Sequence, residues 1–431
     1  MKLLVNCIVF LSLVVLSHSQ PFGRVPVVQE KEKIYHEYGI LPVDNSDSVD
    51  IFILLSFSND KITFKKNEDM RGNITYSSIL SYSAEIRDTF GIIRKTLSLK
   101  DTISVATYEI ATNTNQFQYR KLQTRIKYSP CTIVTEVTQS NTPIEKHTSE
   151  VLKFSKYGND EIASIPSVID VSSSAYSVFN GNIPFSSSKF AFVFTAPKSL
   201  TPDVWKYAIL RYGDHITNSK TQTGFADITA HSIYTPVLSV GIDAKQKQSN
   251  GSLLTVTMES SLLAPGDYLL KLFLFKSTDT LLYKFSVAWR PMPVGLSNAR
   301  YASEAMYYVL TDSEYENFRN MSDRELAVAI NQWWIAKDPT PKTEYNEAMA
   351  EYFKRVDIAR TEYATLNDAD GMKTDRGKVF ILNGKPATVV KNVLDGDILQ
   401  EIWKYNAPQN TTYYFETPRS KQSYKLTKIV N

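Results

Sequence analysis

The stretch DGMKTDRGKVFILNGKP, residues 370–386, places charged side chains between glycines and then becomes abruptly apolar. Asp375 and Arg376 at its centre belong either to an active site or to a charged turn. Thr374 and Asp375 are residue types that fix turns through side-chain hydrogen bonds to the backbone. We therefore predict a turn that joins helices to a sheet, with Arg376 bonding an acid or a carbonyl across it.

The glycines and the apolar run around this turn predict its neighbours. Gly371 and Gly377 lack the spacing of a nucleotide-binding loop, and we expect no helix after Gly377. Gly371 is expected to end a helical block. The run KVFIL (378–382), followed by Asn383-Gly384, predicts a strand and a two-residue hairpin turn. Further strands are expected at ATVVK (387–391), ILQEIWKY (398–405) and TTYYFET (411–417).

Upstream of the turn, apolar residues recur with a helical period. Ser322 and Glu325 have the spacing of a capping box, and Thr343 is expected to cap a long helix. The intervening DPTP (338–341) breaks the helices because proline lacks an N–H donor and clashes with the preceding turn. Residues 299–431 are thus predicted to form an α+β module in which helices lead into a small antiparallel sheet.

Ahead of this module, short β-branched and aromatic runs alternate apolar with polar residues, as half-buried antiparallel strands do. The runs form two groups, residues 49–157 and 189–292, each with the strand spacing of an immunoglobulin-like β-sandwich. A Ser-, Gly- and Asn-rich connection with one strand is expected over residues 158–188. Strands are expected at residues 50–58, 62–66, 74–86, 93–99, 117–128, 131–139, 189–196, 203–213, 235–244, 252–261, 266–275 and 280–289.

Residues 1–19 have the pattern of a secretory signal peptide, with one Lys before an apolar run from Leu3 to Leu16 and small residues at the cleavage site. The run is shorter than the roughly 20 residues that cross a bilayer, and no later segment approaches that length. We therefore expect export to the periplasm or the cell surface, with no transmembrane segment after cleavage. The mature chain is expected to start at Gln20, with a lead-in over residues 20–48.

Composition narrows the classes of partner. Cys131 is the only cysteine left after the signal is removed, so an intrachain disulfide is excluded. The 431 residues include 48 Lys and Arg against 45 Asp and Glu, and the basic residues are dispersed among the acids. No basic stripe of the kind that binds nucleic acid is formed, and we expect no nucleic-acid partner. No cofactor is expected, and the oligomeric state is left open.

A series of short blocks in the C-terminal module carries a family resemblance. The blocks are Asn331-Gln332-Trp333-Trp334, Lys337-Asp338-Pro339-Thr340-Pro341, Thr343, Asn346, Glu347, Glu351, Arg355, residues 371–379, Gly384-Lys385-Pro386 and Glu401-Ile402-Trp403. Over roughly residues 300–415 the chain resembles the GWxTD-domain family of exported bacterial envelope proteins. Met372 stands where the family has its name-giving tryptophan, and Lys337 replaces the usual arginine. The resemblance implies a fold and an exported location, with no established reaction.

The histidines exclude one kind of chemistry from this module. His36, His147, His215 and His231 all lie ahead of residue 299. A Ser-His or Cys-His nucleophile pair within the module is therefore impossible. The spacing of the histidines matches no metal site, and they are most simply loop or strand residues.

Four carboxylates are the remaining candidates for chemistry: Asp338, Glu347, Glu351 and Asp375. They could gather as a general acid and base or hold a divalent cation. The alternative is that Asp338 caps a turn, that the two glutamates form helix-surface ion pairs, and that Asp375 holds the turn before the sheet. We favour the structural alternative, because the sequence has no neighbouring nucleophile and no ligand triad.

Three tryptophans could line a ligand groove or belong to the core. Adjacent side chains on a helix cannot face the same way, so one of Trp333 and Trp334 is expected to be partly exposed. Trp403 is expected in the core.

These observations predict an exported, non-catalytic protein of the cell envelope or surface. Its two β-sandwich modules and its C-terminal module would bind an envelope protein partner. Two alternatives stay open: a carboxylate-dependent hydrolase acting on envelope polymers, and a carbohydrate-binding protein with an exposed aromatic platform.

Overall fold

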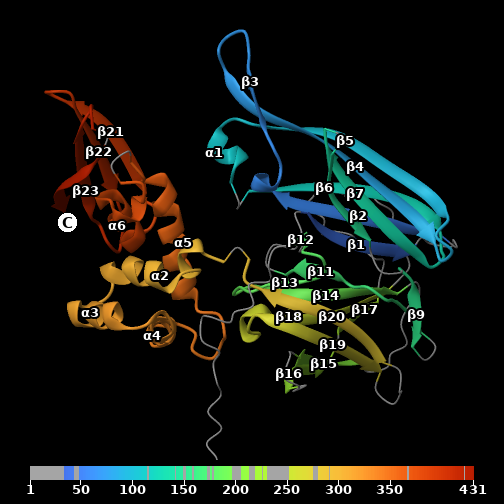
Figure 1. Ribbon diagram of the computed structural model, residues 1–431. Coiled ribbons are helices and arrows are strands. Elements are labelled where there is room, and N and C mark those ends of the chain that lie inside the picture. Colours follow the sequence, from blue (N-terminus) through green and yellow to red (C-terminus); the bar gives the residue numbers. More distant parts are fainter. Residues whose placement is uncertain are drawn as a thin grey trace, which may run out of the picture. The chain divides into compact units, whose positions relative to one another are not determined.

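The computed structural model describes residues 34–42, 48–113, 116–140, 142–148, 152–157, 160–171, 175–176, 179–196, 205–212, 219–225, 227–230, 252–274, 280–290, 292–365, 368–421 and 423–431 (Figure 1). The predicted signal segment, the strand expected at residues 235–244, His215 and His231 lie outside these residues. The described chain divides into two compact units. We call Pro26–Val294 with Asp338–Lys354 the β unit, and Gly295–Lys337 with Arg355–Asn431 the helix–sheet unit.

The first half of the β unit consists of two antiparallel sheets that share one core. One sheet has the order β1-β2-β6, and in the other β3-β4-β7-β8 are joined by β5 on β4. Buried residues of both sheets, such as Ile53 and Ile133, belong to a single apolar cluster. The elements are β1 (Tyr35–Pro42), β2 (Ser48–Ser58), β3 (Lys65–Glu68), β4 (Ile74–Asp88), β5 (Ile93–Val105), α1 (Tyr108–Ala111), β6 (Phe117–Lys127), β7 (Cys131–Gln139) and β8 (Thr142–Thr148).

Side-chain alternation explains this core. Along β4, Leu80, Tyr82, Ala84 and Ile86 point inward, and the residues between them are less buried. Strand β1 lies within the segment that was predicted to be an N-terminal lead-in. It pairs along its whole length with β2, so this part of the lead-in belongs to the sheet.

The second half of the β unit also has two sheets around a common core. Their orders are β12-β11-β14-β18-β17 and β13-β20-β19-β15-β16, and β9 with β10 forms a separate ladder. Further bounds are β9 (Phe154–Tyr157), β10 (Asp160–Ala163), β11 (Ser167–Asp170), β12 (Ala175–Tyr176), β13 (Ile183–Pro184), β14 (Lys189–Ala196), β15 (Trp205–Tyr212), β16 (Ser219–Phe225), β17 (Asp227–Ala230), β18 (Ser252–Glu259), β19 (Gly266–Leu274) and β20 (Thr280–Ala288).

The connection predicted over residues 158–188 is more structured than expected. Four strands, β10 to β13, lie in it, so the expectation of one strand was wrong. The strands are short, and two of them pair with longer strands outside the segment: β11 with β14, and β13 with β20. Pairing partners far along the chain therefore order a segment whose local composition is typical of a loop.

The segment Asp338–Lys354 is held in the β unit by backbone bonds and aromatic packing. The backbone N–H groups of Glu344 and Tyr345 donate to the Ser261 carbonyl at 2.7 and 3.2 Å. The Tyr345 ring lies 5.0 Å from that of Phe185. Thr343 does not cap the helix that follows. That helix begins at Glu347, and the Asn346 side chain accepts the Met349 N–H at 2.9 Å, so the cap lies three residues later than predicted.

The helices of the helix–sheet unit begin at side-chain caps. Asn298 caps α2, and capping boxes at Thr311–Glu314 and Ser322–Glu325 start α3 and α4. The predicted Ser322–Glu325 box is thus confirmed. No helix of the described residues is long and apolar enough to cross a membrane. The helices are α2 (Ala299–Ala305), α3 (Asp312–Asn320), α4 (Asp323–Ile335), α5 (Glu347–Glu362), which continues from the β unit, and α6 (Asp375–Asn383).

Helix α6 replaces a predicted strand. KVFIL and Asn383-Gly384 do not form a strand and a hairpin turn; they form most of this helix and its C-terminal cap. Three consecutive residues, Val379, Phe380 and Ile381, are buried, a pattern that an amphipathic strand cannot give. A four-residue apolar run has no decisive period, and the caps at Thr374 and Gly384 decide for the helix.

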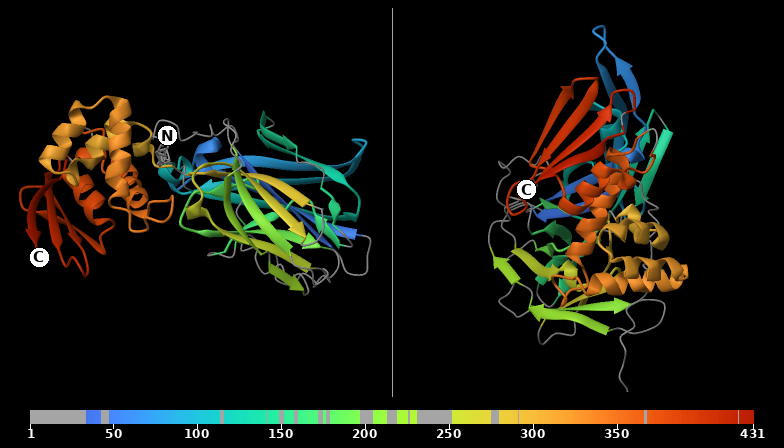
Figure 2. Two further views of the ribbon diagram at one scale, coloured as in Figure 1. Left: turned by 90° about the horizontal axis from the view of Figure 1, so that it is seen from below. Right: turned by 90° about the vertical axis from the view of Figure 1, so that its left-hand side faces the viewer.

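A four-stranded antiparallel sheet completes the unit (Figure 2). Its order, β21-β22-β23-β24, follows the chain. The helices followed by a sheet were predicted, and the last strand was not. Trp403 and Phe415 lie in its core with their rings 4.9 Å apart. The strands are β21 (Thr388–Leu394), β22 (Ile398–Lys404), β23 (Thr412–Pro418) and β24 (Lys425–Val430).

Candidate functional site

The site is the junction formed by residues 370–377, where a 3₁₀ turn, Gly371–Lys373, leads into α6. The Asp370 carboxylate accepts the Met372 N–H at 3.0 Å. The Thr374 hydroxyl accepts the Gly377 N–H at 3.0 Å and donates to the Gly371 carbonyl at 2.8 Å. Thr374 is therefore the N-cap of α6 and closes the turn that precedes it.

The two glycines of the junction allow close backbone packing. A Cβ atom at Gly371 would lie 2.1 Å from the Ala359 carbonyl of α5, and one at Gly377 would lie 1.9 Å from the Gly371 carbonyl. Neither contact can be accommodated without moving backbone. The prediction that Gly371 ends the helical block was wrong, because α6 follows it. Gly371 instead seats the 3₁₀ turn against α5.

Asp375 and Arg376 attach the start of α6 to the sheet. The Asp375 carboxylate accepts the Leu426 N–H of β24 at 2.8 Å. The Arg376 guanidinium donates to the Glu401 carboxylate of β22 at 3.0 Å. Arg376 thus bonds an acid across the junction, as the sequence predicted. Consecutive residues of one helical turn reach two different strands.

Aromatic rings complete the surroundings of this ion pair. The Arg376 guanidinium lies 4.3 Å from the ring centroid of Tyr424 and 5.4 Å from that of Tyr363. The other Glu401 oxygen accepts the Trp403 indole N–H at 3.0 Å. Both carboxylate oxygens of Glu401 therefore have partners, and the arginine and glutamate side chains are only 15% and 7% exposed.

Sequence reasoning placed Glu401 in a block of the family resemblance, but it paired neither Glu401 nor the two tyrosines with Arg376. Glu401 and Trp403 are two residues apart on a strand and so share one face of the sheet. A carboxylate on the same face as a core tryptophan needs a cation or several donors, and this was the signal that could have paired it with Arg376. Tyr424 follows a loop and carries no comparable signal.

Met372 lies inside the junction and is 2% exposed. The Tyr308 hydroxyl donates to the Met372 carbonyl at 2.8 Å, and the Tyr301 hydroxyl donates to Asp370 at 3.3 Å. Burial, followed by the charge of Asp370, raises the pKa of Tyr301, so this phenol stays protonated. The position where the family has tryptophan is thus a packing position in this chain.

The end of α6 is held as firmly as its start. Gly384 has a φ of 76°, a conformation that favours glycine. The Arg355 guanidinium donates to the Ile381 and Leu382 carbonyls at 3.5 and 3.4 Å, and the Tyr405 hydroxyl donates to the Gly384 carbonyl at 2.9 Å. These bonds satisfy carbonyl groups that a helix end leaves free.

The tryptophan pair of α4 divides between surface and core. Trp334 is 5% exposed, whereas Trp333 is half-buried and donates its indole N–H to Glu314 at 3.0 Å. The Lys337 ammonium lies 5.5 Å from the Trp333 ring. Hydrogen bonds from the Thr311 backbone and side chain, then from Trp333, lower the pKa of Glu314. Trp403, 1% exposed, is a core residue.

The three other candidate carboxylates lie in the β unit. Asp338 accepts the Thr340 N–H at 2.8 Å and its hydroxyl at 3.2 Å, and the same hydroxyl donates to Glu347. Glu351, one turn further along α5, also has a partner. Asp338 and Glu347 therefore meet at a turn, and Asp375 belongs to the other unit. Among the described residues no group of three or more His, Cys, Asp or Glu could hold a metal ion.

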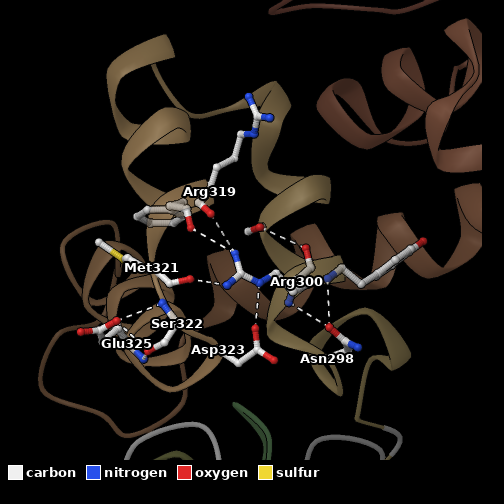
Figure 3. Close-up of polar contacts among 10 residues, drawn as sticks. Asn298, Arg300, Arg319, Met321, Ser322, Asp323 and Glu325 are labelled. Atoms are coloured by element: carbon white, nitrogen blue, oxygen red, sulfur yellow. Dashed lines mark hydrogen bonds and ion pairs between the residues drawn. The ribbon is translucent and has the colours of Figure 1, made fainter.

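A second polar cluster, around Arg300, joins three helices of the same unit (Figure 3). The Arg300 guanidinium donates to the Arg319 carbonyl at 3.2 Å and to the Met321 carbonyl at the end of α3. It also bonds Asp323, the first residue of α4, at 2.7 Å. Sequence reasoning missed this cluster, which fixes the turn between α3 and α4 with one side chain from α2.

Comparison with known proteins gives one family match, in the C-terminal part of the chain. The model of the GWxTD domain matches residues 276–430. The match contains the whole junction, both tryptophans of α4 and the four-stranded sheet. A search of the curated proteins gives no match.

Three of the solved structures that match this chain do so with low identity and low TM-scores. A β-glucuronidase from glycoside hydrolase family 2 is 12% identical with a TM-score of 0.20, covering 35% of this chain and 13% of that one. The BSP domain of a biofilm associated protein is 8% identical with a TM-score of 0.18, and the match covers 60% of this chain and 52% of that one. The adhesin InvE of Yersinia pseudotuberculosis is 11% identical with a TM-score of 0.14, and the match covers 61% of this chain and 63% of that one. The chain spans less than two thirds of each structure, and TM-scores this low carry no argument about fold or function.

Proposed function

Because residues 276–430 of this chain match the model of the GWxTD domain, we propose that the protein is a non-catalytic binding or scaffold component of the cell envelope or cell surface. In this proposal the signal segment directs export, the GWxTD domain binds an envelope protein, and the sheet pairs of the β unit are immunoglobulin-like sandwiches that serve as spacers or binding modules. The proposed domain limits are residues 49–157, 189–292 and 299–431.

The observation that carries the proposal is the use of the polar residues at the junction. Thr374 caps a helix, Asp375 accepts a backbone N–H, and Arg376 pairs with Glu401. Each bond joins elements of the fold. A general acid or base must instead reach a substrate proton, so this arrangement favours a structural role for the motif.

The rival function is a carboxylate-dependent hydrolase acting on envelope polymers. It requires Asp338, Glu347, Glu351 and Asp375 to act in one cleft. The bonds that Asp338 and Glu347 make at Thr340, and the bond from Leu426 to Asp375, favour a cap and turn role for these carboxylates. Carbohydrate binding by the sandwiches is a third possibility and would need an exposed aromatic platform.

Crosslinking followed by affinity recovery of the mature protein from its native envelope tests the proposal. We expect a reproducible protein partner, recovered equally well with Asp375→Asn, which keeps the acceptor for the Leu426 N–H and removes the carboxylate. Recovery of free monomer, together with turnover of envelope saccharides that Asp375→Asn abolishes, would overturn the proposal in favour of the hydrolase.

A further inference from the structure

The two edges of the GWxTD-domain sheet differ in how they are protected. Among the residues that the structure describes, β21 forms one edge and pairs with β22 alone, and β24 forms the other edge and pairs with β23 alone. An exposed edge offers free backbone N–H and C=O groups to any additional strand, and proteins usually block such edges. The state of each edge therefore indicates whether a strand can join the sheet there.

Strand β24 is blocked in three ways. It carries Lys425 and Lys428, its register with β23 shifts between Tyr414 and Phe415, and its Leu426 N–H donates to Asp375. Lysines and irregular pairing are common protections of edge strands, and a bonded N–H cannot serve a further strand. This edge is closed by the same carboxylate that belongs to the GWxTD motif.

Strand β21 has little of this protection. Its register with β22 is regular over all seven residues, its sequence TVVKNVL has no proline, and Lys391 is its only charge. Six of its residues are exposed, and the apolar side chains Val389 and Val393 are 43% and 66% exposed. A regular, exposed and β-branched edge is well suited to accept another strand.

On one face of the sheet, the β21 side chains that would lie beside those of a partner strand have a definite chemistry. Every second residue of β21 lies on this side of the sheet: Val389, Lys391 and Val393. In the register with β22 they pair with Trp403, Glu401 and Leu399, in that order. The order is apolar, cationic, apolar. Directly opposed side chains interact most strongly across strands, and opposite charges there are favourable. A complementary strand therefore carries an acid between two apolar residues.

A second copy of this chain does not fit that pattern. Antiparallel pairing of two β21 strands with full overlap would set each Lys391 opposite the Lys391 of the other copy, because this residue is at the middle of the strand. Like charges in directly opposed positions destabilise a sheet. The charge pattern thus favours a different polypeptide over a homodimer at this edge.

We propose that β21 is a docking edge that binds an extended segment of another protein, with an acidic residue opposite Lys391 and apolar residues opposite Val389 and Val393. The inference rests on the proposed binding function and names the chemistry of the partner. Backbone hydrogen bonds supply most of the binding, and the three side chains select the sequence.

Two terminally blocked fluorescent peptides, TVTETVT and TVTKTVT, test the proposal by anisotropy with the full mature chain. We expect the acidic peptide to bind at least about fivefold more tightly, because one well-placed opposite-charge pair replaces a like-charge pair. Lys391→Glu should invert the preference. Val389→Lys with Val393→Lys should abolish binding of both peptides, and Ile429→Lys on β24 is the matched control that should leave binding unchanged.

Equal affinity for the two peptides, or binding unaffected by the β21 variants, would overturn the proposal. Concentration-dependent dimerisation in sedimentation that Val389→Lys with Val393→Lys abolishes would also overturn it, because the occupant would then be a second copy. The peptide result is independent of the envelope experiment. If a partner is recovered equally well with the β21 double variant, the edge proposal fails and the binding function stands.

Discussion

Glu37 in the β unit and Glu401 in the helix–sheet unit are both strand carboxylates buried in the fold, 2% and 6% exposed. Glu401 pairs with the Arg376 guanidinium and accepts an indole N–H. Glu37 is bonded by the backbone N–H groups of Val168 and Gly181, at 3.1 and 3.2 Å. Burial raises the pKa of Glu37 to about 8, so it is protonated near neutral pH.

The difference shows two ways to bury an acid. The Arg376 guanidinium gives the buried Glu401 carboxylate an ion-pair partner and ties a helix to a strand. Glu37 becomes neutral instead, because two N–H donors only partly offset the loss of water. The neighbouring His36 is likewise buried, and its ring stacks 4.4 Å from that of His147. The β unit therefore buries Glu37 and His36 as neutral groups, and the helix–sheet unit buries an ion pair.

The largest effect is expected when the charge pair is broken. Arg376→Met leaves the Glu401 carboxylate buried without a cation and should lower the free energy of unfolding of the helix–sheet unit by about 3–5 kcal/mol. Hydrogen exchange of peptides from residues 371–430 measures this loss. Arg419→Met is the matched control, because its pair with Asp397 is 67% and 68% exposed and should be worth under about 1 kcal/mol. Equal effects of the two variants would contradict the assignment.

The neutral Glu37 should make the stability of the β unit fall as the pH rises. Glu37 has its ordinary pKa of 4.5 in the unfolded chain and about 8 in the fold, so the folded protein holds the proton more tightly. The free energy of unfolding should therefore fall, by a few kcal/mol in all, as the pH rises from about 4.5 to 8. Urea unfolding of the wild type and of Glu37→Gln over this range measures it. The account fails here if the two proteins have the same pH slope.

His36 should act in the opposite direction. Burial, and then the neighbouring His147, lowers the pKa of His36 to about 3 from an ordinary value of 6.5. The unfolded chain binds this proton first, so stability should be lost as the pH falls from about 6.5 towards 3. His36→Phe should remove this acid sensitivity and leave that of Glu37. Unfolding at acid pH, followed by hydrogen exchange in β1, separates the effect of His36 from that of Glu37. If His36→Phe loses as much stability at acid pH as the wild type does, His36 is not the cause.

The sequence predicted some parts of this comparison and missed others. The alternating runs predicted most strands, and the turn chemistry of Thr374, Asp375 and Arg376 predicted a junction in which Arg376 bonds an acid or a carbonyl across the turn. The partner Glu401 lies 25 residues away, and only the folded register of β22 places it beside Arg376. The His36 and His147 rings lie on strands of two different sheets, β1 and β8, and only the folded chain brings them together. Neither histidine has a local signal.

The error at residues 378–382 has a particular cause. Lys378 is exposed, but Val379, Phe380 and Ile381 are buried together because the first part of α6 packs inside the domain. A helix buried on most sides loses the period that would distinguish it from a strand. Reading Thr374 and Gly384 as helix caps, and not as turn residues, would have given the correct element.

A smaller effect is expected where the backbone packs closely. Gly377→Ala would place a Cβ 1.9 Å from the Gly371 carbonyl and should destabilise the helix–sheet unit by about 1–3 kcal/mol. Gly39→Ala in β1 is the control, since its nearest contact would be an ordinary 3.4 Å, and it should be nearly neutral. Thermal unfolding compares them. A neutral Gly377→Ala would show that the junction has more space than its contacts indicate.

The smallest effect is expected at the cap of α6. Thr374→Ala removes the acceptor for the Gly377 N–H and should cost about 1 kcal/mol. Thr374→Ser keeps the hydroxyl and should restore most of this loss. Urea unfolding measures both variants, and a serine variant as unstable as the alanine variant would point to the methyl group instead of the hydrogen bond.

The central claim is that Arg376 of the GWxTD motif acts through Glu401 to hold helix to sheet. A double-mutant cycle of Arg376→Met and Glu401→Gln, measured by urea unfolding at neutral pH, tests it most directly. Glutamine keeps an acceptor for the Trp403 indole. We predict a coupling energy of at least about 2 kcal/mol, because each single variant leaves the other partner's charge buried alone. Additive effects within about 0.5 kcal/mol would contradict the claim.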